Sequence, residues 1–127
     1  MSESNNPLRK IVKTDNYEYK PYNRYGEPIP GMHWIPLSGK LLNGEFESFL
    51  LKMDRGTSSK PHEHMGIEEF YMVAGTLIDN DNVEFKTGDF VKFSPGSRHY
   101  SYTPEGCTLL VMLRGNNRAL AEDESYT

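Results

Sequence analysis

Apolar and polar residues alternate along most of the chain beyond residue 32, with the period of two that is typical of β-strands. Turn-forming residues interrupt this alternation roughly every 8 to 12 residues, and one of them is the hairpin signal Asn43-Gly44. The pattern predicts strands at 34–37, 46–53, 62–74, 83–86, 89–93, 99–103 and 107–113. Many short strands with almost no helical period predict an all-β barrel or sandwich.

The two ends of the chain lack this alternation. Residues 1–31 are polar, rich in tyrosine and interrupted by proline, which predicts an extended arm; residues 32–114 form the predicted barrel. Four tyrosines indicate that the arm packs on its own barrel or on a partner subunit, and a homodimer is expected. Residues 115–127 are acidic and without strand pattern, which predicts a mobile tail with at most one helical turn at 118–124.

Composition narrows the class of protein. The 127 residues fit one domain, and 36% hydrophobic with 25% charged residues is typical of a globular chain. A net charge of -4 without a basic stripe argues against nucleic-acid binding. Cys107 is the one cysteine, so no internal disulfide is possible, and neither a signal peptide nor a membrane span is evident. A cytoplasmic protein is therefore expected.

Most of the candidate metal-binding residues lie in the segment from Gly56 to Gly75. His62 and His64 are two residues apart, so on a strand both imidazoles point to the same face. Glu68 keeps this parity, whereas Glu69 has the opposite parity and should face away. Imidazole and carboxylate together suit borderline divalent metals such as Fe, Mn, Ni or Zn.

A third histidine, His99, begins a predicted strand directly after the turn at Pro95-Gly96. With His62, His64 and Glu68 it predicts a site for one divalent metal ion per chain. Four protein ligands would leave two neighbouring positions of an octahedral ion open to small molecules. The remaining histidine, His33, lies beside Trp34 and is interpreted as a packing residue.

These motifs resemble those of the cupins. The first cupin motif is Gly, five residues, His-x-His, three or four residues, Glu, six residues and Gly, and the segment from Gly56 to Gly75 fits it throughout. The second motif is matched by Gly88, Gly96 and His99, while Ser94 and Thr103 stand where cupins have Pro and Asn. The resemblance implies a cupin-type double-stranded β-helix, or jelly-roll barrel, over about residues 32–114.

Four longer stretches are similar to the ChrR-like group of single-domain cupins. These stretches are 34–37, 66–76, 88–99 and 106–111. That group includes the zinc-binding domain of an anti-sigma factor. The chain also resembles small cupin dioxygenases that cleave carbon–carbon bonds in β-diketones or hydroxylated acetophenones. The β-diketone enzymes have three-histidine sites, whereas Glu68 would add a carboxylate here.

Three functions follow as alternatives from this resemblance. The first is an Fe(II)-dependent dioxygenase, or a related lyase or isomerase, acting on a small carbonyl compound. The second is a non-enzymatic metal or ligand sensor, although residues 1–31 lack the helical pattern of a domain that holds a sigma factor. The third is a storage or scaffold cupin. The fold alone does not separate them.

Two further features are ambiguous or excluded. The acidic run at 79–82 lacks the glycine and glutamate that an EF-hand requires, and it is interpreted as a hairpin turn. Cys107, on an apolar strand, is interpreted as a buried, inert thiol. One set of apolar residues has the parity either to line a pocket or to fill the barrel: Phe49, Leu51, Phe70, Met72, Leu109 and Val111.

Overall fold

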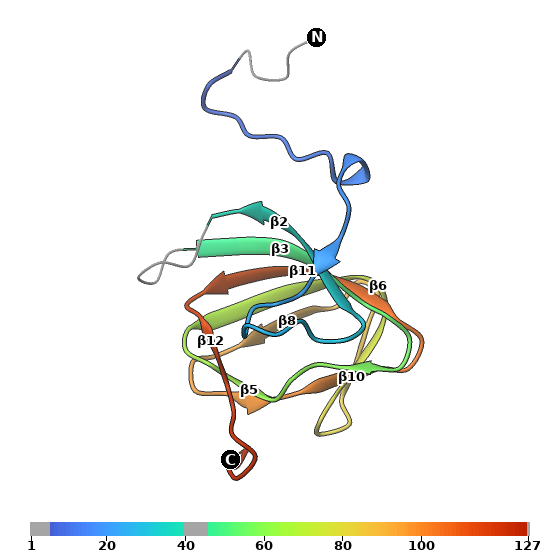
Figure 1. The fold of residues 1–127 in the computed structure, drawn as a ribbon, viewed down its shortest axis with the longest axis vertical. Coiled ribbons are helices and arrows are strands. Elements are labelled where there is room, and N and C mark those ends of the chain that lie inside the picture. Colours follow the sequence, from blue (N-terminus) through green and yellow to red (C-terminus); the bar gives the residue numbers. More distant parts are fainter. Residues whose placement is uncertain (1–5, 40–45, 127) are drawn as a thin grey trace.

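Two antiparallel sheets curl around a common interior in the computed structural model, which describes residues 6–39 and 46–126 (Figure 1). The predicted turn at Asn43-Gly44 lies outside the described residues. The strands within these ranges are β1 (Lys20–Pro21), β2 (Met32–Ser38), β3 (Phe46–Met53), β4 (Thr57–Ser58), β5 (His62–His64), β6 (Ile67–Asp79), β7 (Glu84–Lys86), β8 (Phe90–Phe93), β9 (Arg98–His99), β10 (Ser101–Thr103), β11 (Cys107–Arg114) and β12 (Asn117–Ala119).

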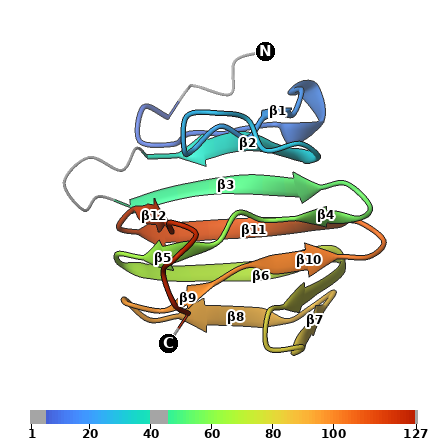
Figure 2. The same cartoon turned by 60° about the horizontal axis from the view of Figure 1, so that its bottom comes forward.

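The larger sheet has the order β1-β2-β3-β11-β6-β10-β4, with β7 and β8 also paired to β6. The smaller sheet has the order β12-β5-β9 and faces the larger one across the interior (Figure 2). A 3-10 turn, Thr14–Asn16, is the one helical element of the described residues, and no helix there is long and apolar enough to cross a membrane. The all-β prediction is confirmed.

The core consists of the inward-facing residues of β3, β11 and β6. Alternation in these strands places every second side chain inside, and the strand register stacks them in layers. Phe49, Val111 and Phe70 are direct cross-strand neighbours, and each is at most 3% exposed. Leu51 pairs with Leu109, which in turn pairs with Met72. This central sheet forms a rigid wall behind the interior.

A β-bulge in β6 changes which side chains face the interior. Thr108 pairs with Ala74 and the next residue, Leu109, pairs with Met72, so Val73 is the extra residue. Before the bulge, the even-numbered positions of β6 are buried; beyond it, Leu77 and Asp79 are buried instead. The bulge therefore turns Asp79 inward.

The two ends of the chain join the fold in different ways. Residues 22–31 dip from β1 into the open side of the curled sheet before β2 begins, whereas residues 6–19 run away from the barrel (Figure 1). Leu8 there is 96% exposed. The boundaries 1–31, 32–114 and 115–127 and the homodimer stay predictions.

The C-terminal segment differs from the sequence-based prediction. No helical turn forms at 118–124; instead, β12 pairs with β5 and completes the smaller sheet. The short strand β4 likewise lies outside the predicted strands, and it pairs with β10. Both short strands are held by partners far away in the sequence, which local patterning does not reveal.

Candidate metal centre

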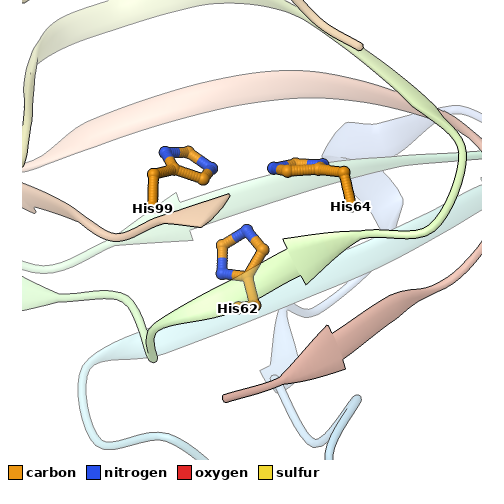
Figure 3. Close-up of side chains that lie close together, drawn as sticks. All are labelled: His62, His64 and His99. Carbon is orange, nitrogen blue, oxygen red and sulfur yellow. The ribbon is translucent and has the colours of Figure 1, made fainter. Parts of the chain in front are cut away.

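Three histidines from the smaller sheet meet in the interior. His62 and His64 lie on β5, and His99 lies on β9 directly opposite His62 in the strand register. All three are buried, and one ligand nitrogen of each lies within 4.8 Å of the others. Figure 3 shows the three imidazole rings turned toward a common centre. The prediction that His62 and His64 share one face is confirmed.

Hydrogen bonds fix the orientation of two of these rings. Nδ1 of His62 lies 2.7 Å from the carbonyl oxygen of Lys60, which can only accept, so Nδ1 carries the proton. Nδ1 of His99 donates to Oδ1 of Asp79 at 2.7 Å, and the same oxygen accepts from the Ser101 hydroxyl. Both rings therefore keep the lone pair of Nε2 for a ligand in the interior.

Nitrogens on two of the three rings have no hydrogen-bond partner among the described residues. These are both ring nitrogens of His64 and Nε2 of His99, and all of them are buried. A buried polar atom without a partner costs about 1–3 kcal/mol, so nitrogens without a hydrogen bond on two converging rings indicate a missing ligand. Neutral imidazoles converging in this way fit a divalent ion of the Fe, Ni or Zn type.

Electrostatics keep the imidazoles of His62 and His64 neutral and able to coordinate. Burial, with a contribution from His99, lowers the pKa of His62 to about 4. Burial and the two neighbouring histidines lower the pKa of His64 to about 2. Neither ring therefore needs to lose a proton before it binds a cation at neutral pH.

Glu68 lies beside the cluster but outside the group of three. Its side chain is buried, as predicted, but it lies on β6 of the larger sheet, because the strand expected at 62–74 is broken after His64. Oε1 of Glu68 lies 3.4 Å from Nδ1 of His64. The same oxygen accepts a hydrogen bond from Asn117 Nδ2 at 3.3 Å. Burial raises the pKa of this carboxyl group. The inward position of Glu68 is confirmed, and its role as a metal ligand stays a prediction.

His33 and Asp79 are the other two residues whose roles the structure makes clear. His33 is on β2, and its Nε2 is 3.2 Å from Oδ2 of Asp54, so it does not join the cluster. Asp79, interpreted from sequence as part of a turn, ends β6 and holds His99. The only sequence signal for Asp79 was a carboxylate beside a turn. Because of the bulge, the alternation of side chains along the strand does not predict the direction of Asp79.

An ion cluster on the outer side fastens the strands that carry the histidines. Glu63, between the two β5 histidines, accepts from Arg98 Nε at 3.1 Å and from Arg118 of β12 at 2.7 Å. Glu124 binds Arg118 at 2.8 Å and lies 3.6 Å from Arg98. Networks of this kind hold geometry better than isolated surface pairs. The C-terminal segment thereby braces the metal centre from outside.

A cavity of about 50 Å³ lies against the inner side of the centre. His62, His99 and Glu68 are among its lining residues. Much of the remaining lining is apolar and includes Phe49, Leu51, Phe70, Leu77, Leu109 and Val111. Five of the six residues of undecided role therefore line a pocket, and Met72, which is fully buried, is core. The space suits a few water molecules or a small ligand.

Comparison with known protein families identifies the family to which the chain belongs. A family model described as the ChrR Cupin-like domain matches residues 8–116. The chain belongs to this family. The cupin-type jelly roll expected from the two motifs is therefore confirmed. A comparison with curated protein sequences gave no match.

Solved structures support the same cupin fold. An acetylacetone dioxygenase from Acinetobacter johnsonii is similar with a TM-score of 0.79 and 15% identity, covering 93% of this chain and 82% of that one. The polyketide cyclase RemF from Streptomyces resistomycificus has a TM-score of 0.72 and 21% identity, covering 91% and 89%. Rhodobacter sphaeroides SigE in complex with the anti-sigma ChrR has a TM-score of 0.62 and 19% identity, covering 78% and 49%. At these identities the likeness establishes the fold alone.

The metal-free cupin should lose stability as the pH falls below about 6.5. The unfolded chain binds protons on His62 and His64 there, whereas the folded chain keeps both rings neutral, because their pKa values are lowered to about 4 and about 2. We expect a loss of about 2 kcal/mol per histidine in the free energy of unfolding between pH 7 and pH 5. Urea unfolding in the presence of a chelator measures it.

The control for this experiment is Glu68→Gln. The raised pKa of Glu68 acts in the opposite sense, because the folded carboxyl group takes up a proton before the unfolded one does. The variant should therefore lose more stability than the wild type over the same range. A wild-type stability that does not change between pH 7 and pH 5 would contradict the assignment of neutral, buried imidazoles.

Proposed function

We propose that this cupin is a metal-dependent enzyme of the dioxygenase type that acts on a small carbonyl compound. The single observation that carries the proposal is the convergence of unpartnered histidine nitrogens at the end of an apolar cavity. A structural metal site is closed by its ligands, whereas a centre beside a cavity can accept a further molecule. The proposal takes Fe(II) as the ion.

The chain contributes orientation and exclusion of water. The bound ion would supply Lewis acidity toward a carbonyl oxygen and a binding position for dioxygen. The apolar walls hold the hydrocarbon part of the substrate and keep bulk water away, which favours a neutral or singly charged ligand over a highly charged one. In the proposed dioxygenase reaction both atoms of dioxygen enter the products, so the reaction needs no external reductant.

We further propose that Glu68 is the fourth protein ligand. Its buried carboxylate is beside His64 and shares the cavity with His62 and His99. Glu68→Gln should weaken metal binding by about tenfold, because a neutral amide is a poorer ligand than a carboxylate. Competition with a chromophoric chelator measures the affinity.

The matched control is Glu69→Gln on the same strand. Glu69 has the opposite parity and is half-buried outside the interior. Its replacement should leave the metal affinity unchanged within about twofold. Equal affinities of the Glu68→Gln variant and the wild type would remove Glu68 from the ligand set and leave a three-histidine site.

Oxygen uptake tests the proposed reaction. The protein is purified without oxygen, loaded with Fe(II) and mixed with a panel of small diketones and hydroxyketones in an oxygen electrode. Consumption that follows the substrate and is lost in His64→Ala supports the proposal. A loaded protein that consumes no oxygen with any member of the panel contradicts it.

A metal or ligand sensor is the second candidate, and the family model favours it by its ChrR description. A sensor would bind metal and a small ligand at the same centre without turnover. Ligand binding in the absence of oxygen uptake therefore separates the sensor from the enzyme.

A further inference from the structure

The segment between β1 and β2, here called the strap (residues 22–31), contributes Tyr22 and Tyr25 to the lining of the cavity beside the metal centre. Backbone hydrogen bonds from Tyr22 N to Met32 O and from Ile29 N to Tyr22 O, each 3.0 Å, close the strap at its base. The Tyr22 ring packs edge-on against Trp34 at 4.7 Å and is 5% exposed. The strap is thus a fixed wall of the site.

A buried arginine stands behind Tyr22. Arg24 Nε donates to the hydroxyl oxygen of Tyr22 at 3.2 Å, and the other two guanidinium nitrogens bind Glu47 at 2.7 Å and Asn116 at 3.1 Å. The Arg24 side chain is only 7% exposed and lies over the ring of Phe49. Burying a charge is costly unless it is fully paired, and here its partners satisfy it.

The contact with Arg24 leaves the Tyr22 hydroxyl as a donor. Within the part of the chain that the structure describes, the Tyr22 oxygen accepts this one hydrogen bond, so its own hydrogen remains for a molecule in the cavity. Burial raises the pKa of Tyr22 to about 12, so the phenol keeps its proton at neutral pH. The positive charge of Arg24 polarises the O–H bond and makes it a stronger donor.

Tyr25 approaches the centre from the same strap. Its ring centroid is 6.3 Å from that of His62, and it lines the cavity together with Asn117, which donates to Glu68. Burial raises the pKa of Tyr25 as well, so this phenol also stays protonated. Tyr22, Tyr25, Asn117, His62 and His99 line one cavity.

We propose that the Tyr22 and Tyr25 hydroxyls form an oxygen-binding subsite beside the histidine cluster, with Arg24 as the positioning residue behind Tyr22. The subsite takes the carbonyl or enolate oxygen of a small, otherwise apolar ligand. An oxygen that gains negative charge beside these donors is stabilised by them, since the dry cavity strengthens such hydrogen bonds. The inference rests on the proposed function for its ligand class.

Tyr22→Phe tests the subsite directly. The protein is loaded with Co(II), which gives a visible spectrum, and titrated without oxygen with pentane-2,4-dione and, separately, with azide. The variant should bind the dione about tenfold more weakly, because one buried donor is lost, and should bind azide as the wild type does. Tyr71→Phe, an exposed position on the outer face of β6, is the matched control and should change neither affinity.

The role of Arg24 is tested through Tyr22. Arg24→Lys keeps a positive charge beside Glu47 but loses the contact of Nε with the Tyr22 oxygen, and it should weaken dione binding about threefold. In the Tyr22→Phe background, the same change should have no further effect on dione binding. An Arg24 effect of full size in that background would overturn its assignment as a positioning residue.

Other outcomes decide between the subsite and the proposed function. Dione affinity within twofold of wild type in Tyr22→Phe, an equal loss for dione and azide, or no dione binding by the wild type each overturns the subsite. Dione binding that depends on Tyr22, in a protein whose Fe(II) form consumes no oxygen, supports the subsite and contradicts the dioxygenase. Oxygen consumption that is unchanged in Tyr22→Phe supports the enzyme and overturns the subsite.

Discussion

His99→Ala should lower the affinity of the protein for a divalent metal ion by more than about 100-fold. His99 presents a buried Nε2 without a protein partner, and the hydrogen bond from Nδ1 to Asp79 fixes the direction of that lone pair. Alanine removes one of three converging imidazoles, and the other two occupy one short strand and cannot enclose an ion from both sides. Metal analysis after dialysis against a chelator of known affinity measures the change.

Two control variants grade this effect. Asp79→Asn keeps the ligand and weakens the support of its ring, so a loss of about tenfold in metal affinity is expected. His33→Ala removes the histidine of β2 that pairs with Asp54, and it should leave metal binding unchanged. Full metal retention by the His99→Ala variant under the same dialysis would contradict the metal centre.

Gly66→Ala should destabilise the folded state by about 3 kcal/mol or more. Gly66 lies between β5 and β6, and a Cβ there would overlap the backbone carbonyl of Arg114 at the end of β11. Gly115 lies at the same crossing of the two segments, because a Cβ on it would lie 2.7 Å from the Cα of Gly66. Two backbone segments therefore touch at this crossing and must separate to admit a methyl group.

The consequence of Gly66→Ala extends to the metal centre. The crossing fixes β5 relative to β6, and hence His64 relative to Glu68. Gly56→Ala is the control: Gly56 has a φ of 80° with nothing within 4 Å of an added Cβ, so only backbone strain of about 1–2 kcal/mol is expected. Thermal and urea unfolding compare the variants, and equal stabilities would refute the close-contact argument.

The sequence predicts those parts of the fold that depend on local alternation. Strand β3 was expected at 46–53 and is found at Phe46–Met53. His62 and His64 face the interior together because a strand keeps a period of two in the direction of its side chains. The strand predicted at 62–74 is broken at Met65 and Gly66, so Glu68 faces the interior from β6 of the other sheet, and parity along one strand does not explain its direction.

The features that the sequence did not reveal depend on contacts between distant residues. Parity counted from Glu68 would turn Asp79 outward, and only the bulge at Val73 reverses this. Strand β12 is three residues long and carries no apolar alternation, and it forms because Arg118 reaches Glu63, 55 residues earlier. Such pairings have no local signature.

The smaller sheet also has a consequence for how fast the protein folds and unfolds. Its ion pairs join residues 35 and 55 positions apart, so long loops must close before β9 and β12 can pair with β5. The three histidines come together only once β9 has paired with β5. A metal ion that binds only this geometry should slow unfolding, because unfolding must separate its ligands, so we expect metal occupancy to set the lifetime of the native chain.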